Sequence, residues 1–136
     1  MTIRPTIARW HRIALERRAD ELASILAADA VFESPVVHTP QKGKTIVSAY
    51  LHGALHVLNN EHFRYGDEWY SDNSAVLEFY SEIDGITING IDIITWNKAG
   101  LITHFKVMVR PLKAINTLHQ KMGEYLVSVG AVKLKS

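Results

Sequence analysis

The chain of 136 residues contains no cysteine. This absence excludes a disulfide framework, a thiolate nucleophile and cysteine-ligated zinc or iron–sulfur sites. Neither sign of charge is in large excess, because 15 Lys and Arg residues are interspersed with 14 Asp and Glu residues. The sequence therefore shows no basic surface that would predict binding to nucleic acid or to a membrane.

Long apolar runs are also missing. No segment approaches the ~18 consecutive apolar residues of a membrane span, and charges interrupt residues 1–18, which is not typical of a signal peptide. We therefore expect a cytoplasmic protein. Gly-rich phosphate loops and clusters of metal ligands are absent, so neither a cofactor nor a metal is expected. An apolar fraction of 47% is sufficient for one domain, 1–136, with its own core.

The apolar residues follow a helical period in the first half of the chain and alternate in the second half. The predicted elements are a helix through 7–14, a shorter helix through 22–26, a strand at 30–34, a helix from 46 to 58, strands over 62–71, 74–83, 87–97 and 101–110, and a closing helix from 112 to 126. This order predicts an α+β fold, with helices against one face of a strongly curved antiparallel sheet. Such a sheet forms a cone whose wide end can bind a small ligand.

The predicted strand at 87–97 carries a single acid, Asp92, among isoleucines. A carboxylate in such surroundings has a partner, faces a cavity or keeps its proton. We interpret Asp92 as the polar group of a closed, mostly apolar pocket. A raised pKa would keep Asp92 protonated near neutrality and able to donate a hydrogen bond to a ligand carbonyl or oxyanion. The alternative is a structural acid bonded to the indole N–H of Trp10 or to Ser34.

Two stretches of the chain resemble stretches of the ketosteroid isomerases, which belong to the NTF2-like superfamily together with the SnoaL-like polyketide cyclases. They are AVFESPVVHTPQKGK (30–44) and GIDIITWNKAGLI (90–102), and the resemblance covers about residues 7–112. It implies an NTF2-like cone, in which a curved antiparallel sheet wraps around N-terminal helices. A C-terminal helix is added here.

The resemblance also implies roles for single residues. Asp92 matches the aspartate that hydrogen-bonds the oxyanion. Ser34, however, stands where the isomerases carry the catalytic aspartate base, and Trp10 stands where they carry a tyrosine that shares the oxyanion. Val107 stands where the hydrolase and cyclase branches carry an aspartate. The best remaining candidate for a general base is His38, because it lies in the loop expected at the pocket mouth and its ordinary pKa suits neutral chemistry.

Further side chains are expected to shape the pocket or to meet a partner. The predicted ligand-binding residues are Trp10, Phe32, Ser34, Leu51, Leu55, Phe79, Ile88, Trp96, Phe105, Val107 and Val109. The opposite, outer face of the sheet carries aromatic and aliphatic side chains, which are Tyr80, Ile91, Ile93 and Met108 among polar ones. This face predicts a homodimer, and superfamily members often pair through it.

His52 and His56 form an i, i+4 pair of the kind that can bind a metal. Helical spacing places both histidines on the face opposite the apolar stripe, and no third ligand is evident. We therefore expect no metal site there.

Two functions fit these observations. The first is an isomerase or cyclase type of enzyme that moves a proton in a hydrophobic carbonyl compound without a cofactor, with Asp92 as the donor and His38 as the base. The second is a non-catalytic module that binds a small apolar ligand, with Asp92 and Trp10 as its polar anchors. A third reading is a structural dimer whose cavity is filled by side chains.

Overall fold

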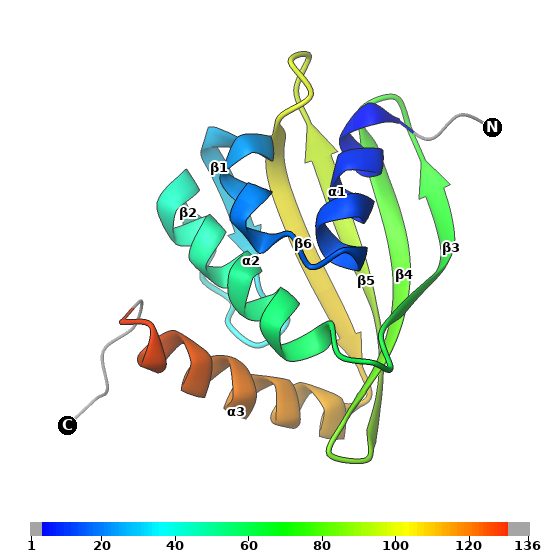
Figure 1. Ribbon diagram of the computed structural model, residues 1–136, viewed down its shortest axis with the longest axis vertical. Helices are drawn as coiled ribbons and strands as arrows, with labels where there is room; N and C mark the ends of the chain where they lie inside the picture. The colour runs from blue at the N-terminus through cyan, green and yellow to red at the C-terminus, as the bar shows by residue number, and fades with distance from the viewer. Residues whose placement is uncertain (1–3, 131–136) are drawn as a thin grey trace.

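In the computed structural model, described over residues 4–130, helices cover one face of a curved six-stranded sheet (Figure 1). The elements in chain order are α1 (Pro5–Leu15), the 3-10 helix η1 (Ala19–Ile25), β1 (Leu26–Glu33), β2 (Gln41–Lys42), α2 (Lys44–Leu58), β3 (Arg64–Tyr70), β4 (Ser74–Ile83), β5 (Ile86–Trp96), β6 (Ile102–Arg110) and α3 (Leu112–Ser128). The ends of the expected domain, 1–3 and 131–136, lie outside the described residues. Within 4–130, no helix is long and apolar enough to cross a membrane.

The strand order of the sheet is β2-β1-β6-β5-β4-β3. The four long strands β3 to β6 pair antiparallel with their neighbours, as the turn signals between them predict. The predicted α+β fold with a curved sheet is confirmed, and the pairing departs from antiparallel at one place, where β1 pairs with β6 in parallel. A hairpin turn sets the direction of adjacent strands, whereas one helix and four other strands separate β1 from β6 in the chain.

The boundaries of the first short elements also differ from the prediction. β1 begins at Leu26 rather than at Ala30, and the preceding segment is a 3-10 helix that ends at Ile25. Arg18 is the N-cap residue of this 3-10 helix and makes no side-chain cap hydrogen bond. The two-residue strand β2 lies in a stretch expected to be a loop.

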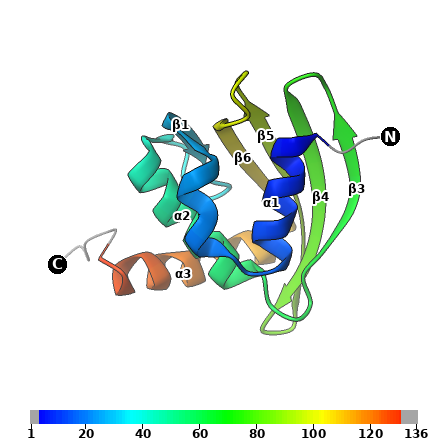
Figure 2. The ribbon, with the colours of Figure 1, turned by 45° about the horizontal axis from the view of Figure 1, so that its top comes forward.

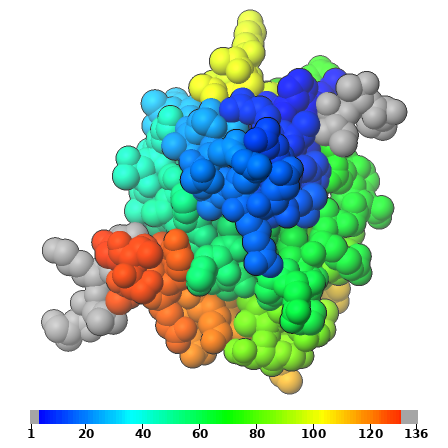
Figure 3. All heavy atoms as spheres, viewed as in Figure 1, coloured from blue at the N-terminus to red at the C-terminus, as the bar shows by residue number. Residues whose placement is uncertain are grey.

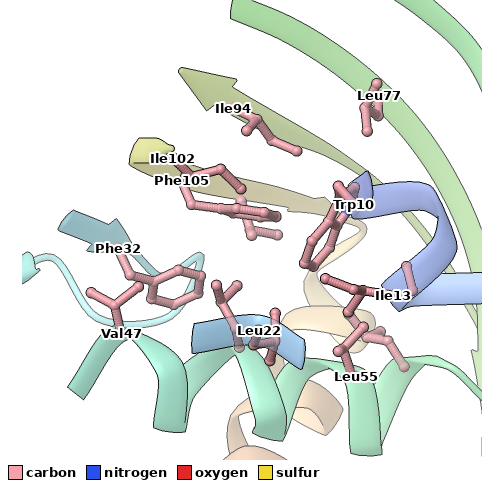
Figure 4. Close-up of a cluster of buried hydrophobic side chains, with 14 of the residues drawn as sticks. Trp10, Ile13, Leu22, Phe32, Val47, Leu55, Leu77, Ile94, Ile102 and Phe105 are labelled. Atoms are coloured by element: carbon pink, nitrogen blue, oxygen red, sulfur yellow. The ribbon is translucent and has the colours of Figure 1, made fainter. Parts of the chain in front are cut away.

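The concave face of the sheet and the helices enclose one apolar core (Figure 4). Trp10 of α1 packs edge-on against Phe105 of β6, with ring centroids 4.9 Å apart. Along β4, Leu77 and Phe79 point into this core and alternate with half-buried side chains on the other face. The core is continuous from α1 and η1 to α2, with buried side chains from every long strand except β3.

The helices form a single layer on the concave side of the sheet (Figure 2). In the space-filling view, α1, η1 and α2 form a continuous surface over the sheet, and α3 lies beneath them (Figure 3). α3 packs against α2, and a Cβ at Gly53 of α2 would lie only 2.9 Å from the methyl carbon of Met122. The convex face of β4, β5 and β6 has no helix across it among the described elements.

Candidate functional site

Asp92 lies at the end of a buried hydrogen-bonded chain of three side chains. The Trp10 Nε1–H donates to Tyr65 Oη at 2.7 Å, and the Tyr65 hydroxyl donates to Asp92 Oδ2 at 2.8 Å. The three residues come from α1, β3 and β5, so the chain spans the interior between helix and sheet. Asp92 is 6% exposed and is the one carboxyl among the buried side chains of residues 4–130.

The electrostatics of this chain follow from its burial. Loss of water raises the pKa of Asp92 from 3.8 to about 7, although the hydrogen bond from Tyr65 acts in the opposite direction. Burial and then the nearby Asp92 carboxylate hold the pKa of Tyr65 well above its ordinary value. Asp92 is therefore part-protonated at neutral pH, while Tyr65 stays a neutral donor.

β3 contains a β-bulge directly after Tyr65. Tyr65 pairs with Phe79, whereas Glu68 pairs with Leu77, so three steps along β3 match two steps along β4. The extra residue turns Tyr65, Glu68 and Tyr70 to the same face of the sheet. Strict alternation would instead have turned Glu68 and Tyr70 away from that face.

A second polar cluster lies beside this chain. Glu68 Oε2 lies 2.6 Å from His11 Nε2, and its other carboxylate oxygen accepts a hydrogen bond from the Tyr70 hydroxyl. The His11 ring contacts the Tyr65 ring edge-on, with 4.9 Å between centroids. Burial and then this Glu68 hydrogen bond raise the pKa of Tyr70. No role was predicted from the sequence for Tyr65, Glu68 or His11. The one signal for the bulge in β3 was Gly66, since a glycine within a strand often marks a bulge.

The expected rim of the pocket lies at the edge of β6. A depression of about 390 Å³ is lined by Ser34 and His38 from the loop after β1 and by Val107 and Val109 of β6, among others. Val107 is directly opposite Asp92 in the pairing of β6 with β5. The structure therefore brings four of the predicted site residues together, and one of them neighbours Asp92.

Side chains fill the space where we expected a pocket around Asp92. Asp92 lines none of the five depressions that we describe on residues 4–130. Leu55 and Trp96 line two other depressions, on the α2 side and at the β5–β6 turn. The other predicted lining residues are packed in the core, and they are Trp10, Phe32, Leu51, Phe79, Ile88 and Phe105. Bulky aromatic and aliphatic side chains occupy the space that the cone leaves.

Neither Trp10 nor Ser34, the two predicted hydrogen-bond partners of Asp92, forms a direct hydrogen bond with it in this structure. Trp10 does not bond Asp92 directly, because the Tyr65 hydroxyl lies between them. Ser34 Oγ accepts a hydrogen bond from the Val36 N–H at 3.0 Å, which is the loop contact typical of a serine before a turn.

Residues 7–105 match the SnoaL-like domain family. The chain belongs to this family. Its structure also resembles that of a steroid delta-isomerase from Pseudomonas aeruginosa, with 37% identity, a TM-score of 0.87 and 93% of each chain covered. Both findings place the chain in the NTF2-like superfamily, as the sequence resemblance implied. No curated protein sequence matches it.

Two further solved structures share the fold of this SnoaL-like domain. A protein with a cystatin-like fold from Silicibacter pomeroyi is 29% identical, with a TM-score of 0.86, and the match covers 93% of this chain and 89% of that one. A Mycobacterium tuberculosis protein in complex with estradiol-17beta-hemisuccinate is 21% identical, with a TM-score of 0.61, over 80% of this chain and 93% of that one. The estradiol derivative is bound to the Mycobacterium tuberculosis protein, and the likeness of this chain to that protein shows a shared fold.

The buried chain gives this SnoaL-like domain a specific chemical capacity. A protonated Asp92 can donate from Oδ1, because Oδ2 already accepts the Tyr65 hydroxyl proton. The donation from Trp10 polarises the Tyr65 hydroxyl and strengthens its bond to Asp92. These contacts therefore leave the protonated form of Asp92 with one hydroxyl donor, at Oδ1.

Proposed function

We propose that this SnoaL-like domain binds a small hydrophobic carbonyl compound and catalyses a cofactor-independent proton transfer in it, of the isomerase or cyclase type. The observation that carries this proposal is the buried chain from Trp10 through Tyr65 to Asp92. Three polar side chains in an apolar core need a reason, and a donor for a ligand oxygen supplies one. The likeness to a steroid delta-isomerase supports a steroid-like compound as the first substrate class to test.

In the proposed reaction, Asp92 stabilises the oxygen of the enolate that forms when a proton leaves the carbon next to the carbonyl. The pKa of about 7 suits this role, since a protonated carboxyl with that pKa is a strong donor and is populated at neutral pH. The ligand enters from the depression at the β6 edge, where Val107 separates the opening from Asp92. Small movements of Val107 and of the loop at Ser34–His38 open the route.

The proposed proton acceptor is His38. It lines the same depression as Ser34, which supports this role because a base must lie beside the bound ligand. Ser34 keeps its hydroxyl proton available, because its oxygen acts as the acceptor for the Val36 N–H, and it can donate to a polar group of the ligand.

A second candidate function is non-catalytic binding of a small apolar ligand. It is favoured by one feature of the site, which is that no carboxylate occupies the places of Ser34 and Val107 where relatives are expected to carry one. In that case Asp92 and Tyr65 anchor the ligand oxygen, and no proton is moved.

A dimer through the convex face of the sheet is also part of the proposal. Ile91 and Ile93 lie half-buried on that face of β5, and Met108 of β6 is 51% exposed beside them. An aliphatic surface of this kind is typical of an interface between subunits. Light scattering should give a mass of twice the chain in solution. The cytoplasmic location remains a prediction from the sequence.

The experiment that separates the two candidate functions combines binding with turnover. Native mass spectrometry tests binding of a β,γ-unsaturated 3-ketosteroid, and ultraviolet absorbance follows its conversion to the conjugated ketone. If the protein is an enzyme, the wild type should bind the ketosteroid and convert it. His38→Gln should bind it but convert it at least tenfold more slowly. Binding without conversion supports the module instead. If neither binding nor conversion occurs with this ketosteroid, the proposed substrate class is wrong.

A further inference from the structure

A cationic hollow lies on the helical side of the molecule, away from Asp92. This depression, of about 270 Å³, is lined by Arg17 from the turn after α1, by His52 and His56 of α2, and by Ala19, Leu55, Asn59 and Tyr125. Among residues 4–130, its lining includes three side chains that are cationic or can become so and no carboxylate. We propose that this hollow is a binding site for a small organic oxyanion, a carboxylate or a phosphate.

Arg17 makes the histidine pair better suited to an anion than to a metal ion. His52 and His56, one turn apart on α2, would suit a metal only if a third ligand joined them. The third side chain that the fold brings to them is a permanent cation, which repels a metal ion and attracts an anion. Within residues 4–130, no group of three metal-ligating side chains is present.

Arg17 is also free of the ion pairs that neutralise its neighbours. Arg12 and Arg18 both contact Glu21, and Arg18 contacts Glu16 as well. Within the described residues, Arg17 forms no such pair. A planar guanidinium with unused donors is well suited to a two-pronged bond with a carboxylate or a phosphate.

The backbone at Arg17 gives an independent reason to look for a function. Arg17 has φ of 55°, and the Arg18 N–H bonds to the Ile13 carbonyl, so Arg17 occupies the left-handed position that ends a helix. Glycine is favoured there, and an arginine is strained. A residue kept at a strained position is a candidate for a functional role. Complementing the helix dipole would require a cation near the end of α1, but not in this conformation.

The apolar and aromatic walls indicate that the ligand has an organic part. The rings of His56 and of Tyr125 of α3 lie 4.9 Å apart between centroids, with 36° between their planes, and Leu55 also lines the hollow. The hollow therefore combines side chains that can bind an anion with apolar and aromatic contact surface. In the adjoining depression, the Asp84 carboxylate is paired with Lys121 at 3.4 Å.

The test is a nuclear magnetic resonance titration of the protein with inorganic phosphate and with benzoate, against sodium chloride at matched ionic strength. Saturable shifts at Arg17, His52 and His56 with either probe are expected. Arg17→Gly should weaken the affinity about tenfold, the value of a lost charged hydrogen bond, while raising the unfolding temperature because strain is removed. Arg17→Lys should retain part of the affinity.

Lys98→Ala is the matched control, since Lys98 is a cation of the β5–β6 turn that lines a different depression. It should leave the affinity unchanged. The proposal is overturned if neither probe gives saturable shifts, if chloride reproduces them, or if Arg17→Gly binds as tightly as the wild type. These outcomes do not depend on ketosteroid binding, so the proposal for this hollow and the proposal for the Asp92 site are tested independently.

Discussion

Replacing Asp92 by Asn removes the one buried carboxyl of the core, and its effect on stability should depend on pH. The pKa of Asp92 is about 7 in the folded protein, against an ordinary 3.8. Between these values the folded state keeps a proton that the unfolded chain releases. The resulting stabilisation is complete below about pH 4 and is lost as the pH rises through about 7. Each pH unit in this window costs about 1.4 kcal/mol, so this group costs the wild type about 3 kcal/mol between pH 5 and pH 8.

Urea unfolding of the wild type and of Asp92→Asn at pH 5 and pH 8 measures how much the free energy of unfolding depends on the Asp92 carboxyl. The other titrating groups, including seven histidines, are common to the two proteins, so their contributions cancel in the difference between them. The free energy of unfolding of Asp92→Asn should rise relative to that of the wild type by about 3 kcal/mol from pH 5 to pH 8. A difference that is the same at both pH values would refute the reasoning, because the carboxyl would then titrate alike in the folded and unfolded states.

Four other substitutions test further parts of the structure. Tyr65→Phe should lower the free energy of unfolding by about 1–3 kcal/mol, since it leaves the buried indole N–H and carboxyl without their shared partner. Gly90→Ala should cost at least about 2 kcal/mol, because its Cβ would lie 2.6 Å from a backbone oxygen, whereas Gly123→Ala, with nothing within 4 Å, should gain up to about 1 kcal/mol. Met108→Glu should shift light scattering to the mass of a single chain without lowering the unfolding temperature, and an unchanged dimer would argue against the convex face.

The inward direction of side chains on β4 and β5 could be predicted from the sequence, because long strands joined by short turns keep a strict period of two. Leu77 and Phe79 on one strand and Asp92 on the next are examples. The SnoaL-like family and the α+β order were predictable for the same reason, since both rest on local patterns.

The partner of Asp92 was not predictable by the same reasoning. Tyr65 faces the core on a strand whose period changes at the bulge after it, and a bulge depends on pairing with β4 rather than on local propensity. The parallel pairing of β1 with β6 was missed because residues 33 and 106 are distant in the sequence. The closed cavity was wrongly expected because cone geometry does not specify how far side chains such as Phe105 fill it.

Infrared spectroscopy of a bound ketosteroid labelled with 13C at its carbonyl tests the central claim most directly, which is that a protonated Asp92 donates a hydrogen bond to the ligand. At pH 5.5 the carbonyl band should lie at a lower wavenumber than in an apolar solvent, and the shift should diminish as the pH rises through about 7. Asp92→Leu should abolish the shift at every pH. A band in the wild type that matches the apolar solvent at pH 5.5, or a shift that survives Asp92→Leu, would contradict the account.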